Sequence, residues 1–210
     1  GFIPDLGDNS YLGFILPLSI VSSSLSASGV AAQNLVRDIE SGYFDKLVLT
    51  PISRSALLLG PILAGAIILG LQAHIVILAA LLMGLKFATG IAGIYAVVAL
   101  AILLGTGFAG FTVSAALGSG SAAATQGASF LFFPLTFIAP TFVPLDLLSG
   151  WLRTAARFNP IPYVMEAMRS LINSGYDATL LLQAVLACLA LATAMYILAV
   201  FALRVRTSRK

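Results

Sequence analysis

The chain has 210 residues, of which 60% are hydrophobic and 9% charged, and its mean hydropathy is +1.04. A soluble domain carries about 25% charged residues, so composition excludes an ordinary soluble domain and predicts a polytopic membrane protein. The net charge of +3 does not indicate nucleic-acid binding, because the basic residues form no cluster interleaved with aromatic side chains.

The chain begins with a short polar stretch and continues as long apolar runs. Residues 1–10 lack the basic start and apolar core of a signal peptide, and we expect a further span before them. A membrane-spanning helix needs about 20 apolar residues, and the alternation typical of a β-barrel is missing. We therefore predict one all-α membrane helix bundle over residues 1–210, with five spans here and six in the intact subunit. The predicted spans are Tyr11–Leu35, Ser55–Met83, Ile91–Leu117, Gln126–Val143 and Thr179–Leu203.

The most charged part of the chain is the loop of residues 36–54, between the first two spans. The chain has 11 basic and eight acidic residues in total. Six of these charged residues lie in the loop: Arg37, Asp38, Glu40, Asp45, Lys46 and Arg54. Hydrophobic side chains recur at steps of three and four from Val36 to Leu47, which predicts a short amphipathic helix, and Gly42 interrupts it. Thr50 resembles an N-cap, with Pro51 at the first position of a new helix that enters the membrane.

This short helix has two interpretations. It can rest on the lipid surface with its charges among the headgroups, or it can dock into a groove on a cytoplasmic partner. Helices on a lipid surface are usually rich in Lys and Arg, whereas the loop before Thr50 has three acidic and two basic residues. The mixed charge favours docking.

The distribution of basic residues predicts the orientation in the membrane. With five spans, the charged loop and the C-terminal tail share one side, which carries seven Lys and Arg residues against four on the other. Because basic residues concentrate in cytoplasmic loops, we predict that the loop and the C-terminus are cytoplasmic and that residues 144–178 are extracytoplasmic. The expected location is the cell membrane, either plasma or inner.

Small residues recur in the second and third spans. The pairs Gly60/Ala64 and Gly105/Ala109 have the spacing that lets helix backbones approach closely. We predict that both pairs pack inside the bundle, with a seam between subunits as the alternative.

Five of the nine prolines lie in residues 133–163. Because proline breaks helices, this segment is predicted to consist of short pieces. One helix would be capped by Asp146 and end at Asn159-Pro160, and a second would start at Pro162 and contain a Glu166–Arg169 pair. The segment is either partly re-entrant and buried in protein, or an interfacial loop with its aromatic residues at the membrane surface.

Candidate catalytic groups are scarce. The chain has one His and one Cys, and it has no P-loop, H-E-x-x-H or G-x-S-x-G motif. No catalytic residue and no metal site are therefore expected. His74 lies inside the second span, where a proton relay and an interhelical hydrogen bond are the alternatives. The lack of a nearby acidic residue favours the hydrogen bond.

Two segments follow the pattern of a known family. The first comprises Arg37, Asp38, Glu40, Gly42, Phe44, Asp45, Leu47, Leu49 and Thr50-Pro51-Ile52-Ser53-Arg54. The second comprises Phe133-Pro134, Pro140, Pro144, Trp151-Leu152-Arg153, Asn159-Pro160, Pro162-Tyr163, Glu166-Ala167 and Arg169. The first resembles the first cytoplasmic loop of type-2 ABC exporter permeases, R-E-x-E-x-G-T-x-D-x-L-x-x-[ST]-P-[VI]-[SR]-R, with Asp38 replacing Glu and Tyr43 replacing Thr. The second resembles that family's segment before the last span.

The resemblance implies a membrane-spanning subunit that exports an amphipathic substrate such as a drug, lipid or polyketide. Its partners would be membrane lipid, a second permease copy or homologue, and two separate ATPase subunits. ATP and Mg would bind to those ATPase subunits, so this chain would hold no cofactor and would not be an enzyme. Residues 36–47 would be the coupling helix, which docks on the ATPase. The resemblance also favours a re-entrant outer segment over an interfacial loop.

The resemblance also assigns residues to three sites. The ATPase-coupling loop would include Arg37, Asp38, Glu40, Phe44, Leu47, Thr50, Pro51 and Arg54. The substrate path would lie at the permease–permease interface along the first and fourth spans, where Ser23, Ser26, Phe130, Phe133 and Phe137 are candidates. Packing inside the protein is the alternative for the phenylalanine residues. The outer re-entrant segment would include Pro144, Trp151, Asn159, Pro160, Glu166 and Arg169.

The alternative function is a secondary transporter or small channel driven by an ion gradient. Such a protein needs intramembrane acidic residues or helices broken at mid-span. None of the eight acidic residues lies centrally in a predicted span, which favours the exporter.

Overall fold

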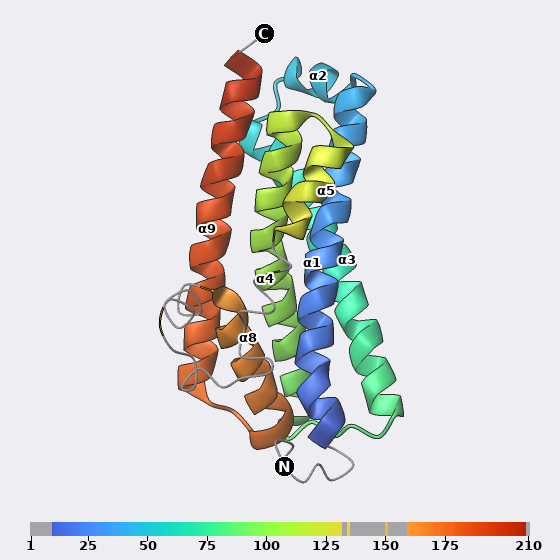
Figure 1. Cartoon of the computed structure of the whole chain (residues 1–210), viewed down its shortest axis with the longest axis vertical. Helices are drawn as coiled ribbons and strands as arrows, with labels where there is room; N and C mark the ends of the chain where they lie inside the picture. Colours follow the sequence, from blue (N-terminus) through green and yellow to red (C-terminus); the bar gives the residue numbers. More distant parts are fainter. Residues whose placement is uncertain (1–9, 132–133, 135–149, 151–158, 209–210) are drawn as a thin grey trace.

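A computed structural model describes residues 10–131, 134, 150 and 159–208. Every regular element in these ranges is a helix, and the long helices run side by side in an elongated bundle (Figure 1). Four helices are long and apolar enough to cross a membrane. They are α1 (Ser10–Glu40), α3 (Arg54–Leu82), α4 (Gly90–Ser119) and α9 (Ala178–Ser208). The all-helical class predicted from composition is confirmed.

Three predicted spans agree closely with α3, α4 and α9. The first predicted span ends too early, because α1 continues from Leu35 to Glu40 without a helix-breaking residue. The fourth predicted span begins within α5 (Ala122–Phe130), but most of it lies outside the described residues. The predicted count of five spans is therefore not confirmed.

Helix α4 is the centre of the bundle. It packs against α1, α3 and α9 along its length, and also contacts α5 and α8 (Pro160–Arg169). Glycines let neighbouring helices approach: a Cβ atom added at Gly110 would lie 3.1 Å from the Met195 Cβ and 3.2 Å from its carbonyl carbon. The small residues of the third span therefore serve the contact between α4 and α9.

The two predicted small-residue pairs differ in the structure. Gly105 and Ala109 are buried, and a Cβ at Gly105 would meet the Leu69 side chain of α3. Gly60 and Ala64 are exposed, and a Cβ at Gly60 would meet nothing within 4 Å. The prediction of packing inside the bundle is thus correct for Gly105/Ala109 and wrong for Gly60/Ala64, because the latter pair lies on the outer face of α3.

Buried hydrophobic side chains form two clusters along the bundle. The larger joins α1, α3, α4, α8 and α9. The smaller joins the helices at the end where α2 (Tyr43–Val48) lies, and we call this the α2 end. Its buried members are Ala32, Leu35, Val36, Phe44, Leu58, Ile62, Val113, Ala116, Leu117, Ala199 and Leu203. The C-terminus lies at the α2 end, and α1 starts at the opposite end (Figure 1).

Helix α8 packs on α9, α1 and α4 at the opposite end of the bundle (Figure 1). Helix α8 starts at Pro160, and the Asn159 side chain caps it by accepting from the Ile161 N–H at 3.1 Å. The predicted start at Pro162 is therefore two residues late, because Asn159 is a favourable N-cap and proline is favourable at the first helical position. A π-helical turn, Ser170–Ser174, follows.

Candidate functional site

The charged loop turns sharply at Gly42. This residue has φ +71°, a left-handed conformation that favours glycine, and α2 begins immediately after it. The predicted break at Gly42 is confirmed. The interrupted helix predicted over residues 36–47 is divided between two elements, because residues 36–40 form the last turn of α1 and residues 43–48 form α2.

The left-handed turn can be tested with Gly42→Ala. A Cβ at this position would meet nothing within 4 Å, so the substitution adds backbone strain without a clash, and we expect a loss of about 1–2 kcal/mol in the free energy of unfolding. Gly118→Ala is the matched control, because it too meets no neighbour but lies in helical backbone, where alanine is favoured. Denaturant unfolding in detergent measures both, and equal effects would contradict the argument.

The restart of the chain after α2 differs from the prediction. Helix α3 begins at Arg54, and the Ser53 hydroxyl oxygen accepts from the Ala56 N–H at 3.3 Å. Thr50 instead donates its hydroxyl to the Leu47 carbonyl at the end of α2. The predicted cap at Thr50 and helix start at Pro51 are therefore wrong, since Ser53 takes the capping role three residues later.

Phe44 anchors α2 to the bundle. Its side chain is 2% exposed and packs within the smaller cluster. The guanidinium carbon of Arg206, from α9, lies 6.0 Å from the centroid of the Phe44 ring. Arg206 also donates to the Leu117 carbonyl near the end of α4, at 2.9 Å. One arginine thus connects the last turns of α4 and α9 with α2.

The rest of the loop presents a mixed surface at the α2 end. Leu49 is 87% exposed, Tyr43 53% and Ile52 45%. Arg37, Glu40 and Lys46 are exposed as well. We call these six residues the end surface. Of the predicted coupling residues, Arg37, Glu40, Thr50 and Pro51 are exposed, Asp38 and Leu47 are half-buried, and Phe44 is buried.

Reasoning from the sequence missed the three exposed apolar residues of the end surface. Tyr43, Leu49 and Ile52 are large side chains in a short stretch that also carries Asp45 and Lys46, and that juxtaposition was the available signal. Arg54 is the first residue of α3.

A second candidate region lies between α1 and α5. Seven residues line a shallow pocket of about 350 Å³: Leu25, Ser26, Gly29, Gln33, Gln126, Ser129 and Phe130. The Gln33 side-chain amide donates to that of Gln126 at 2.7 Å. The structure thus brings Ser26 and Phe130 together, as the predicted substrate path requires, whereas Ser23 does not line this pocket.

The pocket residues Ser26, Gly29 and Gln33 share a face of α1. They follow steps of three and four, which is the spacing of one helix face. This spacing was visible in the sequence and would have identified Gln33. The predicted path residues Phe133 and Phe137 lie outside the described residues.

The outer segment contributes a third cluster, around Arg169. Its guanidinium carbon lies 4.4 Å from the centroid of the Phe14 ring on α1, which is within the range of a cation–π contact. Burial lowers the pKa of Arg169, and the charge of nearby Glu166 opposes this shift. The cluster therefore fixes α8 against the start of α1. Pro144 and Trp151 lie outside the described residues.

His74 has local partners. Its Nδ1 lies 2.7 Å from the Gly70 carbonyl oxygen of the same helix, and its ring meets Tyr95 edge-on with centroids 6.1 Å apart. The predicted interhelical hydrogen bond is replaced by this bond within α3 and a ring contact to α4. Among the residues that the structure describes, no cluster of His, Cys, Asp and Glu could hold a metal ion.

The long apolar helices, the buried α4 and the turned loop define a multi-pass helical membrane protein. A family model for ABC-2 type transporters matches residues 6–173. This match covers most of the chain, which therefore belongs to the ABC-2 type transporter family, as the resemblance in the two segments indicated.

Three curated relatives are similar to the chain. A probable doxorubicin resistance ABC transporter permease protein, DrrC, of Mycobacterium tuberculosis is 24% identical, and the match covers 80% of this chain and 60% of the relative. A daunorubicin resistance ABC transporter permease protein, DrrB1, of Streptomyces coeruleorubidus is 27% identical over 78% of this chain and 58% of the relative. A putative transport permease, ycf38, of Cyanophora paradoxa is 24% identical over 79% and 58%. The chain thus spans about 60% of the length of these relatives.

Proposed function

We propose that this chain is the membrane-spanning subunit of an ATP-driven exporter in the cell membrane. Its partners are two ATPase subunits, which bind ATP and Mg, and a second permease copy or homologue. The chain performs no catalysis itself. Membership of the ABC-2 type transporter family supports this proposal, and so do the names of the relatives as drug resistance permeases.

The observation that carries the proposal is the end surface on a firmly held α2. A mobile loop could move with a partner without moving the bundle. A short helix anchored by buried Phe44 instead transmits the partner's movement to the helices around it. Apolar and charged side chains together suit a groove on another protein. In this proposal the end surface is cytoplasmic and contacts the ATPase, and ATP-driven movement there rocks the bundle.

The proposed substrate is amphipathic, like a drug or lipid, and its path follows the face of α1 and α5. The pocket there combines exposed Phe130 with the hydrogen-bonding groups of Ser26, Gln33 and Gln126. An apolar molecule with a few polar groups fits such a lining.

An ion-gradient-driven transporter fits less well. Within the four long described helices, the acidic residues are Asp38 and Glu40, both near the end of α1. An ion-coupled mechanism places such residues near the middle of the membrane. The exporter is therefore the function that the site supports best.

The proposal predicts that Leu49→Asp and Tyr43→Asp release the ATPase. The permease is co-expressed with a candidate ATPase subunit from the same organism, and the ATPase that co-purifies is measured. Because both side chains are exposed, each variant should fold normally but lose at least about tenfold in association, as expected for a residue central to an interface.

Met83→Asp is the matched control. Met83 is also an exposed apolar residue, but it ends α3 at the opposite end of the bundle, so its variant should retain the ATPase. If the Leu49 and Tyr43 variants keep full ATPase association and transport, α2 is a helix on the lipid surface and the coupling role is wrong.

A further inference from the structure

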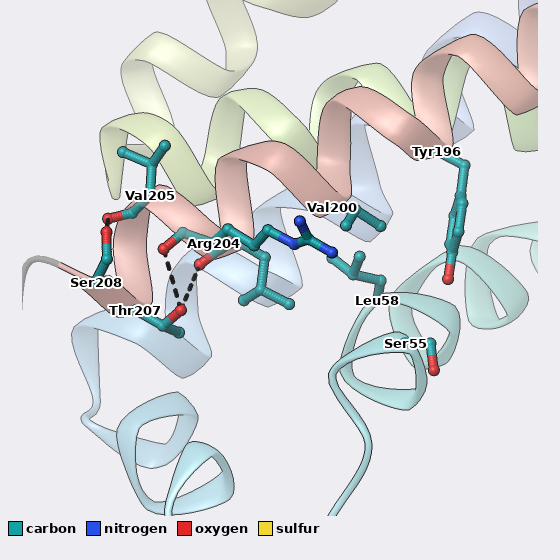
Figure 2. Close-up of a pocket in the computed structure, with 9 residues that line it drawn as sticks. Ser55, Leu58, Tyr196, Val200, Arg204, Val205, Thr207 and Ser208 are labelled. Carbon is teal, nitrogen blue, oxygen red and sulfur yellow. Dashed lines mark hydrogen bonds between the residues drawn. The ribbon is translucent and has the colours of Figure 1, made fainter.

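A groove separates the start of α3 from the last turns of α9. These helices contact each other little, although both pack on α4. The groove has a volume of about 760 Å³, and its walls include Ser55 and Leu58 from α3 and Tyr196, Val200 and Arg204 from α9 (Figure 2). It lies at the α2 end but does not share residues with the end surface or with the pocket between α1 and α5.

Arg204 is the charged group of this groove. Figure 2 shows its side chain extended along α9 toward Val200 and Leu58, and so into the groove instead of toward the chain terminus. Within the residues that the structure describes, no acidic side chain lines the groove, and the Arg204 guanidinium has no hydrogen bond or ion pair. Arg206, two residues later, differs because it donates to the Leu117 carbonyl.

Apolar side chains lie beside this charge, and hydroxyl-bearing side chains lie at both ends of the groove. Leu58 is almost fully buried at its floor, with Val200 beside it. The Thr207 hydroxyl donates within α9 and the Ser55 hydroxyl donates to the Ser53 hydroxyl at 3.2 Å, which leaves Arg204 as the strong donor, with the Tyr196 hydroxyl on the same helix. The site therefore suits an anion attached to an apolar body.

Apolar surface continues from the groove along both helices. On α3 the side chains of Leu59 and Leu63 are exposed, and on α9 those of Ile197 and Phe201 are exposed. In a membrane these surfaces face acyl chains, so a molecule with a phosphate in the groove and chains along the helices satisfies both.

We infer that the α3–α9 groove binds an anionic glycerophospholipid, whose phosphate group pairs with Arg204. Basic pockets between membrane helices bind anionic headgroups in this way. The lipid bridges α3 and α9 where the described part of the chain leaves them apart. This inference concerns a bound lipid and does not depend on which molecule the protein transports.

The test is native mass spectrometry of the full permease in detergent with added phosphatidylglycerol or phosphatidylcholine. We expect the wild type to retain phosphatidylglycerol in preference, and Arg204→Gln to retain about fivefold less, the effect of one basic residue at an anionic surface. Val200→Trp fills the groove and keeps every charge, and it should reduce retention as well. Ser55→Trp fills the groove from an exposed position on the other wall and serves if Val200→Trp unfolds.

Arg37→Gln is the matched control, because it removes one exposed positive charge at the same end but outside the groove. Equal losses in Arg37→Gln and Arg204→Gln, or full retention in folded groove-filling variants, would show diffuse attraction to the basic residues at the α2 end and overturn the inference. Equal retention of phosphatidylcholine would overturn it too. Complete displacement of the lipid by inorganic phosphate would show that the acyl chains contribute nothing and that the groove binds free anions.

Discussion

Phe44→Ala should destabilise this protein more than any other single truncation in the charged loop. The side chain is 2% exposed and lies among residues of α1, α3, α4 and α9. Truncating a buried phenylalanine typically costs about 3–5 kcal/mol, from lost transfer free energy and from the cavity left behind. The loss also removes the ring beneath the Arg206 guanidinium. We therefore expect a lower unfolding midpoint and an α2 that no longer holds its position.

Leu49→Ala is the matched control. Both variants truncate a large apolar side chain of the same loop, but Leu49 is 87% exposed, so its substitution should change the free energy of unfolding by less than about 0.5 kcal/mol. Denaturant unfolding in detergent compares them directly. A Phe44→Leu variant should recover much of the loss, because it refills most of the volume.

Variants of Phe44 and Leu49 also distinguish anchoring of α2 to the bundle from docking of α2 on an ATPase. If the end surface contacts an ATPase, Leu49→Asp weakens association without lowering stability, whereas Phe44→Ala lowers both. A fully stable Phe44→Ala variant would show that α2 is held by something other than this ring, and the anchoring argument would be wrong.

Much of the fold could be predicted from the sequence because long apolar runs identify membrane-spanning helices. A run of about 20 apolar residues has few alternatives to a helix in lipid, and the predicted limits of α3, α4 and α9 are close to the observed ones. The break at Gly42 was predictable for a similar reason, since one residue type is suited to a left-handed turn.

Local caps were less predictable. Thr50-Pro51 and Ser53 offer competing starts for the same helix, and the sequence signal of Thr followed by Pro is the stronger one. The structure uses Ser53 instead. Short-range preferences of this kind differ by about 1 kcal/mol, and the path of the chain between α2 and α3 is enough to reverse them.

Whether an individual side chain points into the bundle or outward was the hardest feature to predict. In a membrane helix nearly every residue is apolar, so hydrophobic periodicity does not show which face is buried. Gly60/Ala64 and Gly105/Ala109 have identical spacing, yet one pair faces outward and the other inward. Phe44 shows the same problem in the loop, because the family pattern marks it as important but does not say whether it meets a partner or the bundle.

The second large effect is expected at Gly110, in the contact between α4 and α9. A Cβ there would lie 3.1 Å from the Met195 Cβ, 3.2 Å from its carbonyl carbon and 3.4 Å from its carbonyl oxygen. Two of these atoms belong to the backbone, so no side-chain rotation relieves the contact and α9 itself must move. Overpacking of this kind costs about 1–3 kcal/mol for added methyl groups, and we expect Gly110→Ala to destabilise the protein and Gly110→Val to do so more strongly.

Gly118 supplies the control series. It lies in the same helix as Gly110, and a Cβ there would meet nothing within 4 Å. Gly118→Ala should be neutral or stabilising, because alanine favours helix by about 1 kcal/mol over glycine, and Gly118→Val should change little. Unfolding midpoints in detergent of the two series therefore diverge with side-chain size if close backbone packing of α4 on α9 holds the bundle together. If the unfolding midpoints of the two series change equally with side-chain size, α9 can move away from α4 without loss of stability. Close packing against α9 would then not be the reason for glycine at position 110.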